Sequence, residues 1–294
     1  MIYPGRIALM PMAAIALGLT IYKRIYIVAA AVLSLIFLLN TASDAASFRL
    51  HGMTAQEIFS NSKAAALANA ACKGDVSEIA HLVHSGADVN YRGKGGISPL
   101  IWAMSCHNYS GMRALLKNGA NPNQPMAYGQ APTWLAAGGS DPKILPILLD
   151  HGGNPNYYCA DCQGTSALEN AIDYRRTANM KLLVQRGANV NFIGALSPGE
   201  CAVVAGRYDY IIYLLHHGYD HDLQGLANAI LQQKGMFNPH WSGYSMWKWQ
   251  YKYWKEALQM LAAKGYKAHK IVRLRVATPP PPLPSGAPIP SGGS

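Results

Sequence analysis

The chain has 294 residues, half of them hydrophobic and only 14% charged, with a formal net charge of +10. This composition is too apolar for a disordered chain and too interrupted for a polytopic membrane protein. Nine basic residues and one acid lie between Lys234 and Arg275, so this stretch carries +8 of the +10. Because the charge is confined to one segment, we expect no nucleic-acid partner.

Residues 1–46 have the features of a signal peptide or a membrane anchor. The run IYIVAAAVLSLIFLL, 15 residues from Ile25 to Leu39, follows Lys23 and Arg24 and precedes the small-residue stretch NTASDAAS. Such a run suits the core of a signal peptide cleaved after Ala45. It is short for a spanning helix, which needs about 20 apolar residues, although flanking residues could extend it into an anchor. Both alternatives predict export or anchoring.

A repeat with a period of about 33 residues follows this segment. Its copies SGADVN, NGANPN, HGGNPN and RGANVN end at Asn90, Asn123, Asn156 and Asn191, and a weaker copy, HGYDHD, ends at Asp222. The first glycines of these copies are 33, 33, 35 and 31 residues apart. A leucine-rich helical pattern precedes each copy, and an alanine-rich segment that opens with a turn signal lies further upstream. Since one such unit cannot bury its own apolar face, several must stack.

The local chemistry of each unit predicts a pair of helices. Ser98 and Ser166 suit helix N-caps, and Pro99 and Pro132 suit the first helical position, where a missing N–H costs nothing. The glycine after the second helix is expected in the left-handed conformation. TAQE, which begins at Thr54, is typical of a capping box. Small residues that let the two helices approach closely are Ala70, Ala103, Ala136, Ala171 and Ala202.

The copy SPLIWAM…LLKNGANPN resembles the ankyrin repeat, T-P-L-H-x-A-A…L-L-x-x-G-A-D-V-N. The resemblance extends from Thr54 to Tyr266 and includes four good copies, one degenerate copy and a diverged last unit. It implies an all-α ankyrin-repeat solenoid of about five to six helix–turn–helix units with β-turn fingers, preceded by a signal or anchor helix. We expect three parts: the signal or anchor at 1–46, the repeat domain at 47–268, and a basic strip with a disordered Pro-rich tail at 269–294.

The last unit contains an aromatic insert, residues 234–252, because the glycine spacing from Gly218 to Gly265 grows to 47. If the chain is helical from Trp247 onward, it has three faces. A face toward the stack holds Trp247, Tyr251, Trp254, Leu258 and Leu261, and a solvated face holds Lys248, Lys252 and Lys255. The third face, with Trp249, Tyr253 and Met260, either caps the end of the stack, over Phe237 and Trp241, or forms a contact surface.

No motif for catalysis was found: H-E-x-x-H, G-x-S-x-G and P-loop spacings are all missing from the sequence. Glu169 and Glu200 occupy equivalent positions on adjacent first helices, and we interpret them as two solvated acids rather than an acid–base pair. The sequence therefore predicts a protein that is not an enzyme and has no cofactor or metal.

Cys159 and Cys162 form a C-x-x-C pair that could be half a zinc site, a redox couple, a loop staple or two free thiols. Zinc needs two more ligands, and a thioredoxin-like couple needs a βαβ unit. The finger that contains the pair is two residues longer than its equivalents. In an exported chain this favours a local disulfide that stiffens the finger. We expect at most this one disulfide, with Cys72, Cys106 and Cys201 as small core residues.

The ankyrin resemblance implies that another protein binds to the fingers and to the concave face of the first helices. Aromatic and arginine side chains there are surplus to folding and typical of interfaces, although some could pack against a neighbouring finger. The candidate partner-binding residues, including those of the insert, are Tyr91, Arg92, Lys94, Met126, Tyr128, Tyr157, Tyr158, Gln163, Tyr174, Arg175, Phe192, Ile193, Trp241, Trp249 and Tyr253.

A signal-like N-terminus on such repeats favours a bacterial protein that is periplasmic, or anchored in the inner membrane with its repeats in the periplasm. The chain is similar to families of periplasmic ankyrin immunity proteins, which implies that it blocks a secreted toxin or effector, such as a lipase, and is a monomer when unbound. Two alternatives remain open. One is an envelope structural or stress-protection adaptor, and the other is a peripheral membrane-surface protein that uses the Trp/Lys-rich insert.

Overall fold

The computed structural model describes residues 48–234 and 248–268. The signal-like segment, most of the aromatic insert and the Pro-rich tail lie outside these residues, as does the candidate binding residue Trp241. None of the helices in the described ranges is both long and apolar enough to cross a bilayer. The fold divides into two compact units, Met1–Ala188 and Asn189–Ser294, and each is described by itself.

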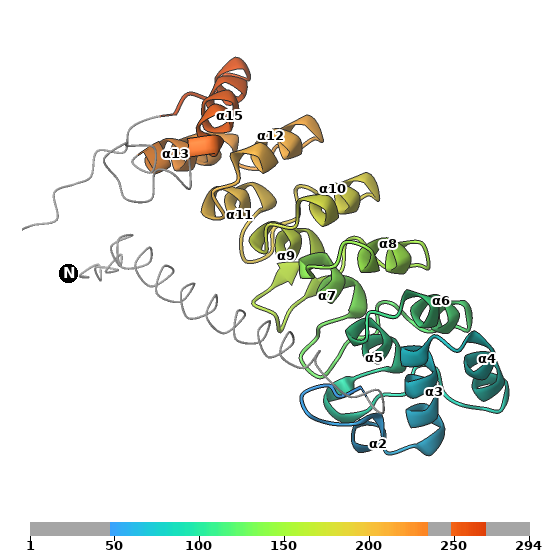
Figure 1. Ribbon diagram of the computed structural model, residues 1–294. Coiled ribbons are helices and arrows are strands. Elements are labelled where there is room, and N and C mark those ends of the chain that lie inside the picture. The colour runs from blue at the N-terminus through green and yellow to red at the C-terminus, as the bar shows by residue number, and fades with distance from the viewer. Residues whose placement is uncertain (1–47, 235–247, 269–294) are drawn as a thin grey trace, which may run out of the picture. The chain divides into compact units, whose positions relative to one another are not determined.

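Unit 1 is built from helix pairs joined by short turns (Figure 1). A short leading helix, α2 (Ala55–Ile58), precedes four pairs. The pairs are α3 (Ser62–Lys73) with α4 (Val76–His84), α5 (Pro99–Ser105) with α6 (Tyr109–Lys117), α7 (Pro132–Gly138) with α8 (Ile144–Leu149), and α9 (Ala167–Asp173) with α10 (Thr177–Gln185). The first helices pack together, α3 on α5 and α7 on α9, and α4, α6 and α8 form a second layer.

Unit 2 contains two further pairs, α11 (Pro198–Val204) with α12 (Tyr208–His216) and α13 (Leu223–Gln232) with α15 (Tyr251–Ala263). A short 3-10 turn, η3 (Lys248–Gln250), leads directly into α15. Helix α15 packs on α12 and α13, and the indole Nε1 of the buried Trp254 donates to the carbonyl of Ile230 at 2.8 Å. The mostly helical architecture agrees with the fold class expected from the repeat pattern.

The predicted helix signals are confirmed. Ser98 and Ser166 cap α5 and α9 through their side chains. Pro99 and Pro132 are the first residues of their helices. The glycines that follow the second helices all have φ between 87° and 93°, a left-handed conformation that costs glycine little; they are Gly86, Gly119, Gly152, Gly187, Gly218 and Gly265. The five contact alanines are buried, which lets the paired helices approach closely.

The asparagine that ends each of the four good finger motifs clamps the next repeat. Asn90 Nδ2 donates to the carbonyl of Gly119 at 2.9 Å, and its Oδ1 accepts from Asn121 N at 2.7 Å. Asn123 makes the same two bonds to Gly152 and Asn154, each 2.8 Å long. In unit 2, Asn191 repeats the pattern within its own unit. An amide side chain is required because it must donate and accept at once.

Asn123→Ala is expected to lower the free energy of unfolding by about 2 kcal/mol, since it removes two hydrogen bonds between repeats. Urea denaturation followed by circular dichroism measures the loss. The control is Asn121→Ala, which removes one bond within its own finger and is expected to cost less than half as much. Equal losses of unfolding free energy in the two variants would show that the bonds of Asn123 to the next repeat stabilise the fold no more than a bond within one finger.

Candidate protein-binding surface

The fingers are the segments between each left-handed glycine and the next first helix, and their tips in unit 1 are exposed. Tyr128 is 72% exposed and Tyr158 is 45% exposed. We define the finger surface as the exposed candidates on these tips: Arg92, Lys94, Tyr128, Tyr158 and Gln163. At the far end of α9, Tyr174 and Arg175 are also exposed.

Three candidates support the fingers rather than project from them. The hydroxyl of Tyr91 lies 2.6 Å from that of Ser60, and its ring packs against Phe59. Met126 is partly buried against the hydrophobic cluster around Trp102. Tyr157 is half-buried and donates through its hydroxyl to the carbonyl of Gly129 at 2.7 Å. These side chains hold neighbouring fingers together.

Adjacent fingers also touch through their backbones. Ala127 N donates to the carbonyl of Gly95 at 2.9 Å. A Cβ on Gly96 would lie only 2.7 Å from Ala127 N, and Gly96 has a φ of +77°. Glycine is therefore required here for both the close approach and the backbone conformation. The tips form a connected row rather than separate loops.

The enlarged finger that contains the C-x-x-C pair is the most structured of the row. Strands β1 (Tyr158–Cys159) and β2 (Thr165–Ser166) pair in antiparallel fashion across it. A disulfide joins the buried Cys159 and Cys162, and each sulfur lies 3.6 Å from the carbonyl oxygen of Tyr128. The bridge therefore braces the finger that holds Tyr158 and also contacts the backbone of Tyr128.

Cys159→Ser/Cys162→Ser is expected to speed amide hydrogen exchange across residues 157–166 and to lower stability by about 2 kcal/mol, the chain-entropy value for so short a loop. Exchange is measured peptide by peptide with mass spectrometry. Peptides from α4 serve as an internal control and should exchange as in the wild type. Unchanged exchange in the finger would show that the bridge does not brace it.

A second disulfide, Cys72–Cys106, corrects the expectation of at most one bond. These cysteines belong to the ends of α3 and α5, which pack side by side, and their Cα atoms are 5.5 Å apart, well within disulfide range. Their separation of 34 residues is one repeat period. The two cysteines occupy equivalent positions in adjacent repeats, and this equivalence was the sequence signal that would have revealed the pair. Cys201 is buried and lies outside both disulfides, as expected of a core residue.

The two glutamates interpreted as solvated acids have a structural role instead. Glu169 is fully buried, and its Oε2 accepts from Ser166 N at 2.7 Å to complete a capping box on α9. Glu200 does the same for α11, accepting from Ser197 N at 2.8 Å. The interpretation as solvated acids was wrong because it did not consider the capping spacing from Ser to Glu.

Sequence reasoning missed a cluster of titratable groups between the second and third repeats. Asp141 Oδ2 lies 2.9 Å from His107 Nδ1 and accepts from the Tyr109 hydroxyl at 2.6 Å. Partial burial raises the pKa of Asp141, but the hydrogen bonds from Tyr109 and His107 outweigh it and lower that pKa below its usual value. The same bond raises the pKa of Tyr109. Asp141 lies more than 30 positions after His107 and Tyr109 in the sequence, so no short motif could reveal the cluster.

In unit 2, Ile193 is 55% exposed on its finger while Phe192 is half-buried. Trp249 is 54% exposed, and its ring meets that of the half-buried Tyr253 edge to face, with centroids 6.4 Å apart. Trp254 and Leu261 are buried toward the neighbouring helices, as the predicted face requires, whereas Tyr251 is partly exposed.

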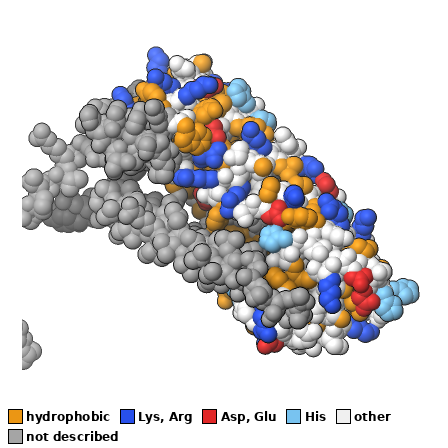
Figure 2. Space-filling view, viewed as in Figure 1, with side chains coloured by type: hydrophobic (Ala, Val, Ile, Leu, Met, Phe, Trp, Pro, Cys, Tyr) orange, Lys and Arg blue, Asp and Glu red, His pale blue; other side chains and the backbone are white. Residues whose placement is uncertain are grey.

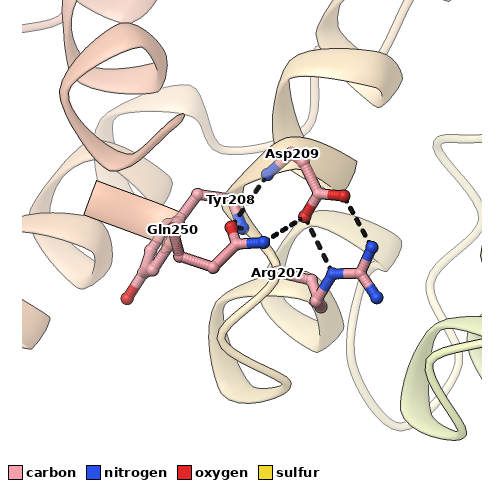
Figure 3. Close-up of polar contacts among 4 residues, drawn as sticks. All are labelled: Arg207, Tyr208, Asp209 and Gln250. Atoms are coloured by element: carbon pink, nitrogen blue, oxygen red, sulfur yellow. Dashed lines mark hydrogen bonds and ion pairs between the residues drawn. The ribbon is translucent and has the colours of Figure 1, made fainter. Parts of the chain in front are cut away.

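Gln250 joins the start of α15 to the start of α12 (Figure 3). Its buried side-chain carbonyl accepts from Tyr208 N at 2.8 Å and Asp209 N at 3.3 Å, and its amide donates to Asp209 Oδ1 at 2.8 Å. The guanidinium of Arg207 donates to both carboxylate oxygens of Asp209. Because α12 has no N-cap from its own sequence, Gln250 supplies the missing acceptor from 42 residues away.

The free energy of unfolding should fall in acid because the Asp209 carboxylate becomes protonated. Burial raises the pKa of Asp209, but hydrogen bonds from Arg207 and Gln250 outweigh it and lower that pKa below the ordinary value of 3.8. The contribution is therefore fully present above the unfolded-state pKa and lost as the pH falls through the lower folded-state pKa. Asp209→Asn should be less stable at neutral pH and lose less stability in acid. Denaturation at several pH values checks this, with the exposed Asp220→Asn as control; equal acid slopes in wild type and Asp209→Asn would contradict it.

Among the described residues, no group of three or more His, Cys, Asp or Glu side chains is arranged to hold a metal ion. What the described residues do present is a row of exposed aromatic and basic tips on a stack of helix pairs.

Comparison with known proteins supports an ankyrin-repeat protein. Residues 95–126 match the family model of the ankyrin repeat. The chain is 24% identical over 176 residues to human SH3 and multiple ankyrin repeat domains protein 2, a match that covers 48% of this chain and 10% of that protein. It is 35% identical over 96 residues to an ankyrin repeat-containing protein of Treponema pallidum (strain Nichols), covering 32% of each.

The matches therefore span at most about a third of the length of these relatives. Ankyrin repeats generally mediate contacts between proteins, and the ankyrin-repeat proteins that the chain resembles are typically binding modules rather than enzymes.

Proposed function

We propose that this chain is a non-enzymatic binding module that captures another protein through the finger surface of unit 1. The observation that carries the proposal is the pair Tyr128 and Tyr158, two exposed aromatic rings on adjacent fingers. The hydroxyl of Tyr157 donates to the carbonyl of Gly129, and the sulfurs of the Cys159–Cys162 bridge lie against the carbonyl of Tyr128, so the two fingers are held together. Tyrosine offers a large contact area with few rotatable bonds, so it loses little entropy on binding. A finger that is braced by a disulfide loses still less conformational entropy on binding.

Charge complements the aromatic tips. Arg92 and Lys94 are exposed on the first finger and Arg175 at the end of α9. Arginine beside tyrosine is the composition that dominates the energetics of protein interfaces. A partner with an acidic rim around an apolar pocket would suit this surface. We propose a folded protein of this kind as the partner.

The cellular role that we propose is an immunity-like inhibitor in the cell envelope, in which the finger surface covers a secreted effector. The N-terminal sequence supports this placement, since residues 1–46 have the pattern of a signal peptide or anchor. The repeats would then lie in the periplasm, followed by the Pro-rich tail. The alternative is an adaptor that binds a resident envelope protein.

Two experiments test this proposal together. Protease protection in intact cells and in cells with a permeable outer membrane locates the repeats, and purification of the tagged chain from the producing strain recovers its partner. An effector that is toxic without the chain supports the immunity role, and a resident envelope protein supports the adaptor. Repeats found in the cytosol would overturn the placement, and recovery of no stoichiometric partner would overturn the capture.

A further inference from the structure

The last helix, α15, has one buried side and one exposed side. Trp254, Ala257 and Leu261 are buried against α12 and α13, which accounts for one side of the helix. On the opposite side Lys252 and Lys255 are exposed. Figure 2 shows Lys/Arg and hydrophobic side chains interspersed over this helix.

Aromatic rings flank these lysines. Trp249 is 54% exposed, Tyr251 is 38% exposed, and Tyr266, just after the helix, is 37% exposed. The ammonium of Lys255 lies 4.3 Å from the centroid of the Tyr251 ring, and the guanidinium of Arg207 lies 5.3 Å from that of Trp249. We call Trp249, Tyr251, Lys252, Lys255 and Tyr266 the α15 outer surface.

The segment after the helix is held in place and adds to the positive charge. The side-chain amide of Gln224 on α13 donates to the carbonyl of Lys267 at 2.7 Å. This bond fixes Lys267 beside the start of α13, and both Lys264 and Lys267 are exposed. Glu256 is the only acid within α15, and it is half-buried.

The chemistry of this surface differs from that of the fingers. Protein interfaces are enriched in arginine and depleted in lysine. Surfaces that lie on a bilayer combine lysine, which attracts anionic headgroups, with tryptophan and tyrosine, which settle at the headgroup level. Lysines near such a surface each contribute on the order of a factor of five in affinity. The α15 outer surface has the composition of a surface that lies on a bilayer.

We propose that the α15 outer surface docks on a bilayer that contains anionic phospholipid. Lys252 and Lys255 contact the phosphate groups, and Trp249, Tyr251 and Tyr266 insert their rings among the headgroups. This contact uses residues of unit 2 and none of the finger surface of unit 1.

The test uses the full-length chain and vesicles that contain brominated phospholipid, which quenches nearby tryptophan. One set of vesicles is phosphatidylcholine alone, and in the other a third of the lipid is phosphatidylglycerol. We expect extra quenching with the anionic vesicles, absent in Trp249→Phe and abolished by high salt. Lys252→Gln/Lys255→Gln should need about thirtyfold more lipid to reach half of that extra quenching.

Residues 1–46 are present in every sample, so only differences between vesicles and variants report on α15. The matched control is Lys73→Gln/Lys117→Gln, which removes two exposed lysines from helix ends in unit 1 and should behave as the wild type. Equal quenching in both vesicle types, or in Trp249→Phe and wild type, would overturn the proposal. So would binding of polyglutamate through Lys252 and Lys255 without any vesicle effect, because that result would assign the surface to an acidic polypeptide.

Discussion

Gly111→Ala is expected to lower the free energy of unfolding by about 3 kcal/mol, at the upper end for overpacking. Helix α6 crosses α3 so closely that a Cβ on Gly111 would lie 1.9 Å from the carbonyl oxygen of Ala71 and 2.7 Å from its carbonyl carbon. These are backbone atoms, so α6 must move away from α3 as a whole. Because alanine otherwise favours helices over glycine, a loss of stability has to come from this contact.

Chemical denaturation of Gly111→Ala and of Ser110→Ala makes the comparison direct, because Ser110 is the adjacent exposed residue of α6. Ser110→Ala should be neutral or slightly stabilising. If the two variants were equally stable, the close packing of α6 on α3 would be contradicted.

Gln250→Ala is expected to cost about 3 kcal/mol, since it leaves the N–H groups of Tyr208 and Asp209 without an acceptor in a buried place and removes a donor to the Asp209 carboxylate. The loss should appear as faster hydrogen exchange at the start of α12 and along α15. The control is Gln259→Ala, a substitution at an exposed position of α15. Unaltered exchange at α12 would show that Gln250 is not its cap.

The parts of the fold that could be predicted depend on local chemistry. Ser98 and Ser166 cap helices, Pro99 begins one, and Gly119 ends one, because each of these roles is decided within a few residues. Repetition strengthened each prediction, since the same signals returned in phase. The clamp made by Asn123 explains why asparagine ends the four good finger motifs, although its partners lie about 30 residues away.

The parts that could not be predicted depend on contacts between distant residues. Nothing near Gln250 in the sequence indicates that it caps α12, because Gln250 lies 42 residues after Tyr208. In the candidate surface, composition identified Tyr128 and Tyr158 but could not separate them from Tyr157, whose hydroxyl is used by the neighbouring finger. Only the packing shows which rings are exposed.

The central claim is that the finger surface binds a protein, and it is tested most directly by titrating the purified chain with the partner recovered from the producing strain. Tyr128→Ser/Tyr158→Ser should raise the Kd at least a hundredfold, because two interface tyrosines contribute on the order of 3 kcal/mol or more. Val76→Ser, which changes an exposed apolar residue of α4, should bind as the wild type does. A finger variant that stays folded and binds with an unchanged Kd would contradict the claim.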